Sequence, residues 1–328
     1  MKDRMIISRT PLRITFTGGG TDLPAYFCAN PPGRVLSAAI DKYIHVTVNK
    51  KFDNKIRVSY SVTEIVDNVD QIVHPSVREA LRLLNIDGGI EIVSISDIPS
   101  RGTGLGSSST FLVGLLNALH AYRGEFVSAD ELGREAVQVE RRILREPGGL
   151  QDQYMAAFGG MQMLEFYPDW SVRNSPVIMK EEYREALMEN LLLLYTGRER
   201  SSTSIHENQS KAVAYNEKMY NKMKDLTMKL FGKLSSGDLN EVGRIMDANW
   251  QLKKELADGI SDPEIDRLYN LAIMNGALGG KLIGAGGGGF LLFYAPKEMQ
   301  PGIVSSLGLR KVDFKIDFQG SRIVFVGE

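Results

Sequence analysis

Three consecutive serines follow a glycine-rich loop in residues 99–110, Pro-Ser-Arg-Gly-Thr-Gly-Leu-Gly-Ser-Ser-Ser-Thr. An apolar alternating run over residues 90–98 predicts a strand before the loop. Leucines at positions 112, 115, 116 and 119 recur at helical spacing after it. Glycines let a backbone approach a ligand closely, and the free N–H groups and dipole of a helix N-terminus attract anions. We therefore expect this loop to hold phosphate groups.

Other interpretations of the loop remain open at this point. Turn glycines followed by N-cap serines have the same composition. The loop lacks the Gly-Lys-Ser/Thr ending of a P-loop, and Ser109 stands where a Rossmann fingerprint has its third glycine. A phosphate loop with serines in place of lysine predicts that a hydroxyl meets a metal ion while the backbone holds the phosphates.

Two further glycine-rich turns end in aspartates. Gly18-Gly19-Gly20 precede Thr21 and Asp22, and Gly148-Gly149 lead to Asp152. A carboxylate at position 22 suits sugar hydroxyls or a cation, although an Asx turn is an equal alternative. Taken alone, Asp152 fits a turn residue as well as a general base, and Glu140 fits a solvated helix position.

A fourth glycine segment, residues 284–289, formally matches G-x-G-x-x-G. It precedes an apolar strand-like run instead of opening a helix, so it fails the context that dinucleotide binding requires. We expect a glycine turn packed tightly against another loop or a ligand.

Composition limits the class of protein. The 328 residues suggest two domains, and 43% hydrophobic and 24% charged residues are ordinary for a globular protein. A net charge of −1 recruits neither nucleic acid nor an anionic membrane, so neither partner is expected. Cys28 is the only cysteine, and we expect it to be buried and apolar. With no long apolar run at the start or elsewhere, we expect a cytoplasmic protein.

The order of predicted elements is that of an α+β protein. Short strands are expected at 5–8, 13–17, 35–40, 44–49 and 56–60, and helices at 75–85, 110–122 and 128–144, with Ser128 and Glu131 as a capping box. The polar stretch 169–184 places a boundary between domains at 1–175 and 176–328. The second half should begin with a strand at 191–196, continue with helices at 203–234, 238–257 and 263–275, and end with two strands at 312–318 and 322–326. Lysines on these helices are expected to be solvated.

The four glycine segments resemble, in their order, those of the GHMP small-molecule kinases, which include galactokinase, homoserine kinase and mevalonate kinase. The matching residues are Thr-Pro-Leu-Arg at 10–13 with Gly-Gly-Gly-Thr-Asp at 18–22, Gly-Leu-Gly-Ser-Ser-Ser at 104–109, Gly-Leu-Gln-Asp-Gln at 149–153 and Lys-Leu-Ile-Gly-Ala-Gly-Gly-Gly-Gly at 281–289. The resemblance implies the GHMP kinase fold, with an N-terminal domain like ribosomal protein S5 domain 2 and a ferredoxin-like C-terminal domain. It also implies an ATP-dependent sugar kinase.

The resemblance implies roles for individual residues. Asp152 would accept the proton of the attacking hydroxyl, and Arg13 would neutralise charge on the transferred phosphoryl group. Mg²⁺ would be bound by Ser108 and Glu140. The ATP phosphates would be wrapped by Gly102, Gly104, Leu105, Gly106, Ser107, Ser108 and Ser109. The acceptor would meet Gly20, Thr21, Asp22, Gly286 and Gly287.

Within the family, the form Gly-Gly-Gly-Thr-Asp-Leu-Pro at 18–24 and the segment 195–202 are similar to kinases that phosphorylate heptose or fucose at C1. Galactokinases have Gly-Glu-His-Thr-Asp at the first position, which disfavours galactose. The implied acceptor is a sugar phosphate, D-glycero-D-manno-heptose 7-phosphate. L-fucose or another sugar is the open alternative, and a sugar sensor that binds ATP without turnover is the alternative from another class. The oligomeric state has no signal in the sequence.

A phosphorylated acceptor needs fixed positive charge at the end far from the attacked hydroxyl. Arg198 and Arg200, between a predicted strand and a helix, are the candidates. The alternative for them is a surface turn in which Glu199 offsets the two arginines.

Overall fold

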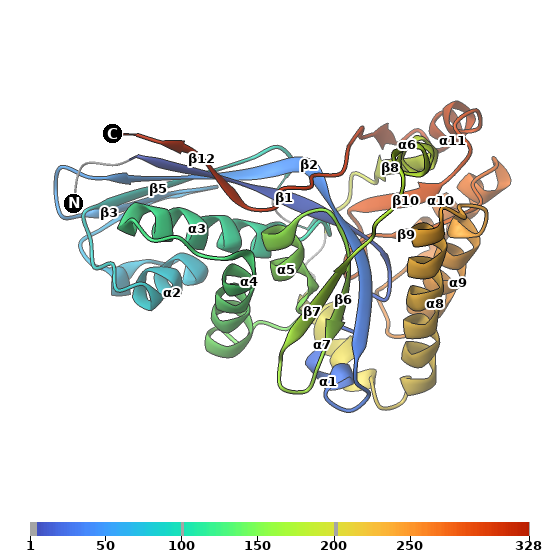
Figure 1. The fold of residues 1–328 in the computed structure, drawn as a ribbon, viewed down its shortest axis with the longest axis horizontal. Helices are drawn as coiled ribbons and strands as arrows, with labels where there is room; N and C mark the ends of the chain where they lie inside the picture. The colour runs from blue at the N-terminus through green and yellow to red at the C-terminus, as the bar shows by residue number, and fades with distance from the viewer. Residues whose placement is uncertain (1–4, 100–101, 200–202, 328) are drawn as a thin grey trace.

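The computed structural model describes residues 5–99, 102–199 and 203–327. Its first domain is built on a long twisted sheet with the strand order β12-β1-β2-β5-β3-β4, from which β6 and β7 branch at β2 (Figure 1). The strands are β1 (Ile6–Thr17), β2 (Gly33–Lys50), β3 (Ile56–Ser59), β4 (Thr63–Val66), β5 (Ile90–Ser96), β6 (Met161–Phe166), β7 (Val172–Pro176) and β12 (Arg322–Val326).

Two strands of this sheet are longer than the sequence predicts. The runs on either side of Pro11 form one strand, β1, and the runs on either side of residues 41–43 form one strand, β2. The β1–β2 register shifts between Pro11 and Leu12, an irregularity of the kind that lets a proline remain in a strand. Residues 33–38 of β2 pair with β6 and residues 44–50 pair with β5, so β2 changes its partner strand between residues 38 and 44.

Helices cover one face of the first sheet (Figure 1). They are α2 (Pro75–Leu83), α3 (Ser107–Arg123), α4 (Ala129–Val137) and α5 (Gln151–Phe158), with the short α1 (Pro24–Phe27), the 3₁₀ turn η1 (Val69–Gln71) and the π-helical turn η2 (Gln138–Ile143). The central helix α3 is buried along most of its length. Its Gly114 lets it approach β1, because a Cβ there would lie 2.8 Å from Oγ1 of Thr10, and Oγ of Ser8 donates to the Gly114 carbonyl at 2.7 Å. This close packing fixes where the N-terminus of α3 points.

The second domain is a four-stranded antiparallel sheet with the order β11-β8-β10-β9. Its elements are α6 (Glu181–Asn190), β8 (Leu191–Tyr195), α7 (Thr203–Ala212), α8 (Glu217–Ser236), α9 (Val242–Lys254), α10 (Pro263–Met274), β9 (Gly279–Leu282), β10 (Phe290–Tyr294), α11 (Gln300–Leu307) and β11 (Arg310–Lys311). Numbered within the domain, the strand order is 4-1-3-2, which is the ferredoxin-like order. Helices α8 and α9 also pack on β1 and β2, so the two domains share a broad seam.

The end of the chain departs from the predicted division into residues 1–175 and 176–328. β12 returns to the first sheet and pairs antiparallel with β1, and Ile316 forms a bridge to Ile40 of β2. Hydrogen bonding explains this arrangement, because β1 offers a free ladder edge that a strand can satisfy. The closing strand therefore belongs to the first sheet.

Four smaller expectations were wrong. The strand expected over 312–318 is reduced to the single bridge at Ile316. The helix expected over 203–234 is two helices, α7 and α8, with a break between them. Cys28 is exposed, because it ends a one-turn surface helix instead of facing a core. Lys253 of α9 is 4% exposed and not solvated, since it lies in the seam between the domains.

Across the described residues, the helices are too short or too polar to cross a membrane. The capping box is confirmed in one half, since Oγ of Ser128 accepts from the N–H of Glu131 at 3.2 Å.

A histidine joins the end of α3 to α4. His120 contacts Glu135 through Nε2 at 2.9 Å and Glu125 through Nδ1 at 3.2 Å. The hydrogen bond with Glu135 is the main cause that raises the pKa of His120 above 6.5, with burial opposing it. Because the folded-state pKa is raised, the stabilisation is present below pH 6.5 and is lost as pH rises through the folded-state value.

We expect His120→Gln to lower Tm by about 2–4 °C at pH 6. At pH 9 the difference from wild type should shrink, because the wild-type imidazole is then neutral. Thermal unfolding at several pH values measures this. His45→Gln is the control, since the structure describes no carboxylate contact for His45. A Tm difference that stays constant from pH 6 to 9 would contradict the charged pair.

Candidate active site

The glycine-rich loop that is expected to hold phosphate (residues 102–109, the phosphate loop) lies at the N-terminus of α3, as predicted. Gly106 is the N-cap residue with a φ of +79°, a left-handed conformation that glycine adopts readily. A cleft of about 360 Å³ opens in front of it. The loop residues that line this cleft are Gly102, Thr103, Gly104, Gly106, Ser107, Ser108 and Ser109. Leu105 is fully buried, so its side chain belongs to the core and only its backbone serves the loop.

The fourth glycine segment packs directly on this loop from the second domain. A Cβ on Gly104 would lie 2.4 Å from the carbonyl oxygen of Ile283, and one on Gly284 would lie 2.5 Å from Cα of Gly104. A Cβ on Gly289 would lie 2.2 Å from the carbonyl oxygen of Thr103. The expectation of a turn packed against another loop is confirmed, and no side chain fits at these three glycines.

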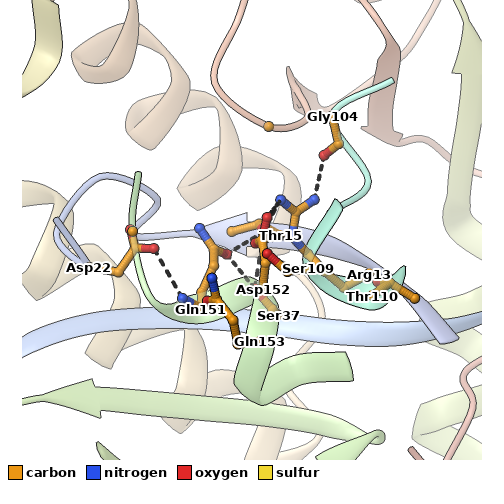
Figure 2. A network of polar contacts seen from close by, with 12 residues as sticks. Arg13, Thr15, Asp22, Ser37, Gly104, Ser109, Thr110, Gln151, Asp152 and Gln153 are labelled. Atoms are coloured by element: carbon orange, nitrogen blue, oxygen red, sulfur yellow. Dashed lines mark hydrogen bonds and ion pairs between the residues drawn. The ribbon is translucent and has the colours of Figure 1, made fainter. Parts of the chain in front are cut away.

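Arg13 of β1 and Asp152 of α5 form a bidentate ion pair (Figure 2). Nε of Arg13 donates to Oδ1 of Asp152 at 2.8 Å and Nη2 donates to Oδ2 at 2.9 Å. Nη1 of Arg13 donates to the carbonyl oxygen of Gly104. The guanidinium thereby joins the phosphate loop to the carboxylate, and the side chain of Asp152 remains 23% exposed to the cleft.

Glu140 lies behind the serines at the start of α3. It is 1% exposed and accepts from Oγ of Ser108 at 2.9 Å and from Oγ of Ser109 at 2.7 Å. It also accepts from Nε2 of Gln153. The π-helical turn η2 carries Glu140, and such turns often mark functional positions in helices. A buried carboxylate beside a hydroxyl at the edge of the cleft is a donor set that suits a hard cation such as Mg²⁺.

Asp22 occupies the loop after β1 and contacts the turn before α5. Its Oδ1 accepts from the N–H of Gly20 at 2.8 Å, and its Oδ2 accepts from the N–H of Gln151 at 3.3 Å, the contact drawn in Figure 2. Gly149 makes room for it, because a Cβ there would lie 1.8 Å from Oδ2 of Asp22. Burial raises the pKa of Asp22, against the effect of these backbone N–H groups.

A small inner pocket of about 40 Å³ continues from the cleft toward Asp22. Arg13 and Asp152 line both spaces. The second domain contributes His206 and Gln209 of α7 and Lys253 of α9 to the inner pocket. Burial lowers the pKa of Lys253 to about 8, and burial together with nearby cations lowers the pKa of His206 to about 4.

Of the other residues predicted to meet the acceptor, two line the cleft or the inner pocket and two make contacts within the protein. Gly20 lines the inner pocket and Gly286 lines the cleft. The hydroxyl of Thr21 donates to backbone carbonyl oxygens and holds its own loop together. The N–H of Gly287 donates to the carbonyl oxygen of Ile260 at 3.0 Å, and Gly287 is absent from the described cleft lining.

Arg198 forms a bidentate ion pair with Asp262, the N-cap of α10. Its backbone lies beside the fourth glycine segment, since the N–H of Gly289 donates to its carbonyl oxygen at 2.8 Å. Its side chain is not part of the described cleft lining. Arg200 lies outside the described residues. The prediction that this pair holds an acceptor phosphate stays a prediction.

Sequence reasoning missed four residues of the site: Arg141, His206, Gln209 and Lys253. Arg141 follows Glu140, and its Nε donates to the carbonyl oxygen of Gly149 at 3.1 Å. The other three come from helices whose amphipathic patterns resemble those of any surface helix. The glycines that Lys253 contacts lie far away in sequence, so no local signal could have revealed it.

Fold and site together are those expected of a phosphotransferase: a glycine-rich loop at a helix N-terminus, an adjoining carboxylate and a second small pocket between two domains. The chain matches the GHMP kinases N-terminal domain over residues 71–160 and the GHMP kinases C-terminal family over residues 228–306. It belongs to the GHMP kinases and is an ATP-dependent sugar kinase.

Three similar proteins illustrate this membership. D-glycero-alpha-D-manno-heptose 7-phosphate kinase of Campylobacter jejuni is 32% identical over 93% of each chain. The solved structure of a putative sugar kinase from Campylobacter jejuni is 29% identical, with a TM-score of 0.77 over 97% of this chain and 98% of that one. A D-glycero-D-manno-heptose 1-phosphate kinase structure from Bacteriodes thetaiotaomicron has a TM-score of 0.81 at 24% identity, covering 98% and 100%, which supports the fold alone.

Gly149→Ala tests the position of Asp22. The added methyl overlaps the Asp22 carboxylate and must displace it, so we expect kcat/KM for the sugar to fall roughly a hundredfold, as for a misplaced binding group. Gly232→Ala is the control, because nothing lies within 4 Å of a Cβ at that position in α8. It should keep full activity. If Gly149→Ala keeps the wild-type kcat/KM, Asp22 does not contribute to sugar binding.

Proposed function

We propose that this chain transfers the γ-phosphoryl group of ATP to the anomeric hydroxyl of D-glycero-D-manno-heptose 7-phosphate and forms the 1,7-bisphosphate. The observation that carries the proposal is the Arg13–Asp152 pair, which lines both the phosphate-loop cleft and the inner pocket with Asp22. An acceptor hydroxyl located between the two spaces meets a carboxylate and a transferable phosphoryl group together. The heptose acceptor is favoured by the Campylobacter jejuni relative, whose name states that activity.

ATP would bind with its phosphates along residues 102–109, where backbone N–H groups and the α3 dipole face the cleft. Ser108 and Glu140 would hold Mg²⁺ beside them, and this ion would neutralise charge on the phosphate oxygens. No group of three or more potential metal-binding side chains occurs within the described ranges. A site of one hydroxyl and one carboxylate is consistent with an ion that takes its remaining ligands from phosphates and water.

The chain's own residues account for the transfer. Asp152 accepts the proton of the acceptor hydroxyl as that oxygen forms a bond to the γ-phosphorus, and the bond from phosphorus to the departing ADP oxygen breaks. Arg13, fixed by Asp152 and Gly104, lies where negative charge develops and stabilises it without reorganising. Asp22 accepts hydrogen bonds from sugar hydroxyls. Arg198 and Arg200 would meet the 7-phosphate.

A coupled ADP-release assay tests the acceptor. Heptose 7-phosphate, L-fucose and galactose are compared at equal concentrations with the wild-type enzyme. We expect the highest kcat/KM with heptose 7-phosphate and little turnover of galactose. Faster turnover of L-fucose would overturn the heptose acceptor and favour the alternative within the family. ATP binding without ADP release in the presence of any of the three sugars would favour a sensor that binds ATP without turnover.

Asp152→Asn tests the base. The amide keeps the shape but cannot take the proton, so kcat should fall by roughly 10²–10⁴. Nucleotide affinity, measured by titration calorimetry, should change little, because the phosphate loop is intact. Asp313→Asn, at a side chain that is 90% exposed, is the matched control. A loss of kcat below tenfold would leave Asp152 as a positioning residue.

A further inference from the structure

Buried polar side-chain atoms without hydrogen-bond partners gather on the second-domain side of the inner pocket, among the described residues. The side chain of Gln209 is 1% exposed, and its Nε2 has no hydrogen-bond partner among the described residues. Nδ1 of His206 on the same helix is likewise buried and without a partner there. Both residues line the pocket. A buried polar atom without a partner destabilises the fold, so two such atoms that line one pocket point to a ligand that completes their hydrogen bonds.

Lys253 reaches the same pocket from α9. Its Nζ donates to the carbonyl oxygen of Gly284 at 2.5 Å, which uses one of its three hydrogens. Gly19 lies beside the ammonium, since a Cβ on it would be in ordinary contact with Nζ at 3.6 Å. The ammonium therefore lies between the first and the fourth glycine segments, where the two domains meet.

The first domain presents acceptors to these donors. Asp22 and Asp152 both line the inner pocket, and among the described residues no ion pair joins Lys253 to either carboxylate. Opposite charges thus face the same small space without touching. A hydroxyl group can bridge them, because it donates to a carboxylate and accepts from an ammonium or amide.

Size decides which part of the acceptor enters. The pocket is lined by the carboxylates of Asp22 and Asp152 and by the cations Arg13, Arg141 and Lys253, so its charge by itself selects neither for nor against an anion. With its pKa near 4, His206 is neutral at pH 7 and adds no positive charge. The volume of about 40 Å³ accommodates a few water-sized groups, which matches hydroxyls of a sugar ring and not a whole sugar phosphate.

We infer that Lys253 and Gln209 are specificity-determining residues, through which the second domain recognises ring hydroxyls of the acceptor sugar opposite Asp22. The inference rests on the proposed function as a sugar kinase, but not on which sugar is used. The inference assigns two parts of the acceptor to two places. The inner pocket binds neutral ring hydroxyls, and any phosphate on the acceptor binds elsewhere.

Lys253→Met and Gln209→Leu test the inference. Each is assayed for KM of ATP and for KM of two acceptors, heptose 7-phosphate and the same heptose without phosphate. Lys253→Met should raise KM for both sugars by roughly tenfold to a hundredfold, the effect of losing a charge-assisted hydrogen bond. Gln209→Leu should raise both by roughly three- to tenfold, the effect of a neutral bond. KM for ATP should stay within about twofold of wild type.

Matched controls lie one residue away. Lys254→Met removes an ammonium that contacts Asp266 at 3.3 Å outside the pocket, and Asn208→Leu replaces an exposed amide on α7. Both should keep wild-type KM values. Calorimetric titration of each variant with sugar, in the absence of ATP, gives a second measure that does not need turnover.

Three outcomes would overturn the inference. If Lys253→Met raises KM for the phosphorylated sugar alone, Lys253 binds the acceptor phosphate. If it raises KM for ATP, Lys253 contacts the nucleotide. Unchanged KM values and sugar affinity with a lower Tm would make both residues structural. If the wild type prefers L-fucose, the same variants are assayed with L-fucose, so that the proposed acceptor fails while the role of the pocket is still decided.

Discussion

The site depends on an approach of two backbones that leaves no space for a side chain. Thr103 and Gly104 of the phosphate loop meet Ile283, Gly284 and Gly289 of the second domain at distances that a Cβ would turn into overlap. Because of this contact, the fourth glycine segment of the second domain forms one wall of the cleft in front of α3. Because Arg13 also bonds to the carbonyl of Gly104, the same contact sets the position of Asp152. One steric constraint thereby aligns the phosphate loop and the carboxylate.

Charges inside the site follow two different rules. Arg13 with Asp152, and Glu140 with its hydroxyl and amide donors, are satisfied within the protein, which holds them in one geometry before any ligand binds. Within the described ranges, Asp22 and Lys253 are buried without an ion-pair partner, and their pKa values shift in the directions that burial dictates. The paired groups suit steps that require preorganisation. The unpaired groups suit a ligand that completes their hydrogen bonds.

Much of this architecture could be predicted from short segments. The α+β class, the four glycine segments and the strand–loop–helix at 90–122 are local patterns, because backbone conformation at glycines and apolar periodicity are set by neighbouring residues. The ferredoxin-like second domain followed from the family resemblance and is confirmed by the strand order. The return of β12 to the first sheet was not predictable, because strand pairing depends on an edge that forms hundreds of residues earlier in the chain.

The sequence by itself determined that a glycine-rich loop with three serines opens a helix, and a helix N-terminus needs only its own residues to attract an anion. The roles expected of Asp152, Glu140, Arg13 and Asp22 came from the family resemblance, because residue type and spacing alone left them open. Tertiary structure alone decided that Arg198 pairs with Asp262, and that Lys253, a lysine expected to be solvated, lies buried beside Gly19 and Gly284. The physical reason is that burial and pairing depend on which other segment of the chain folds into the same place, and that segment can be far away in sequence.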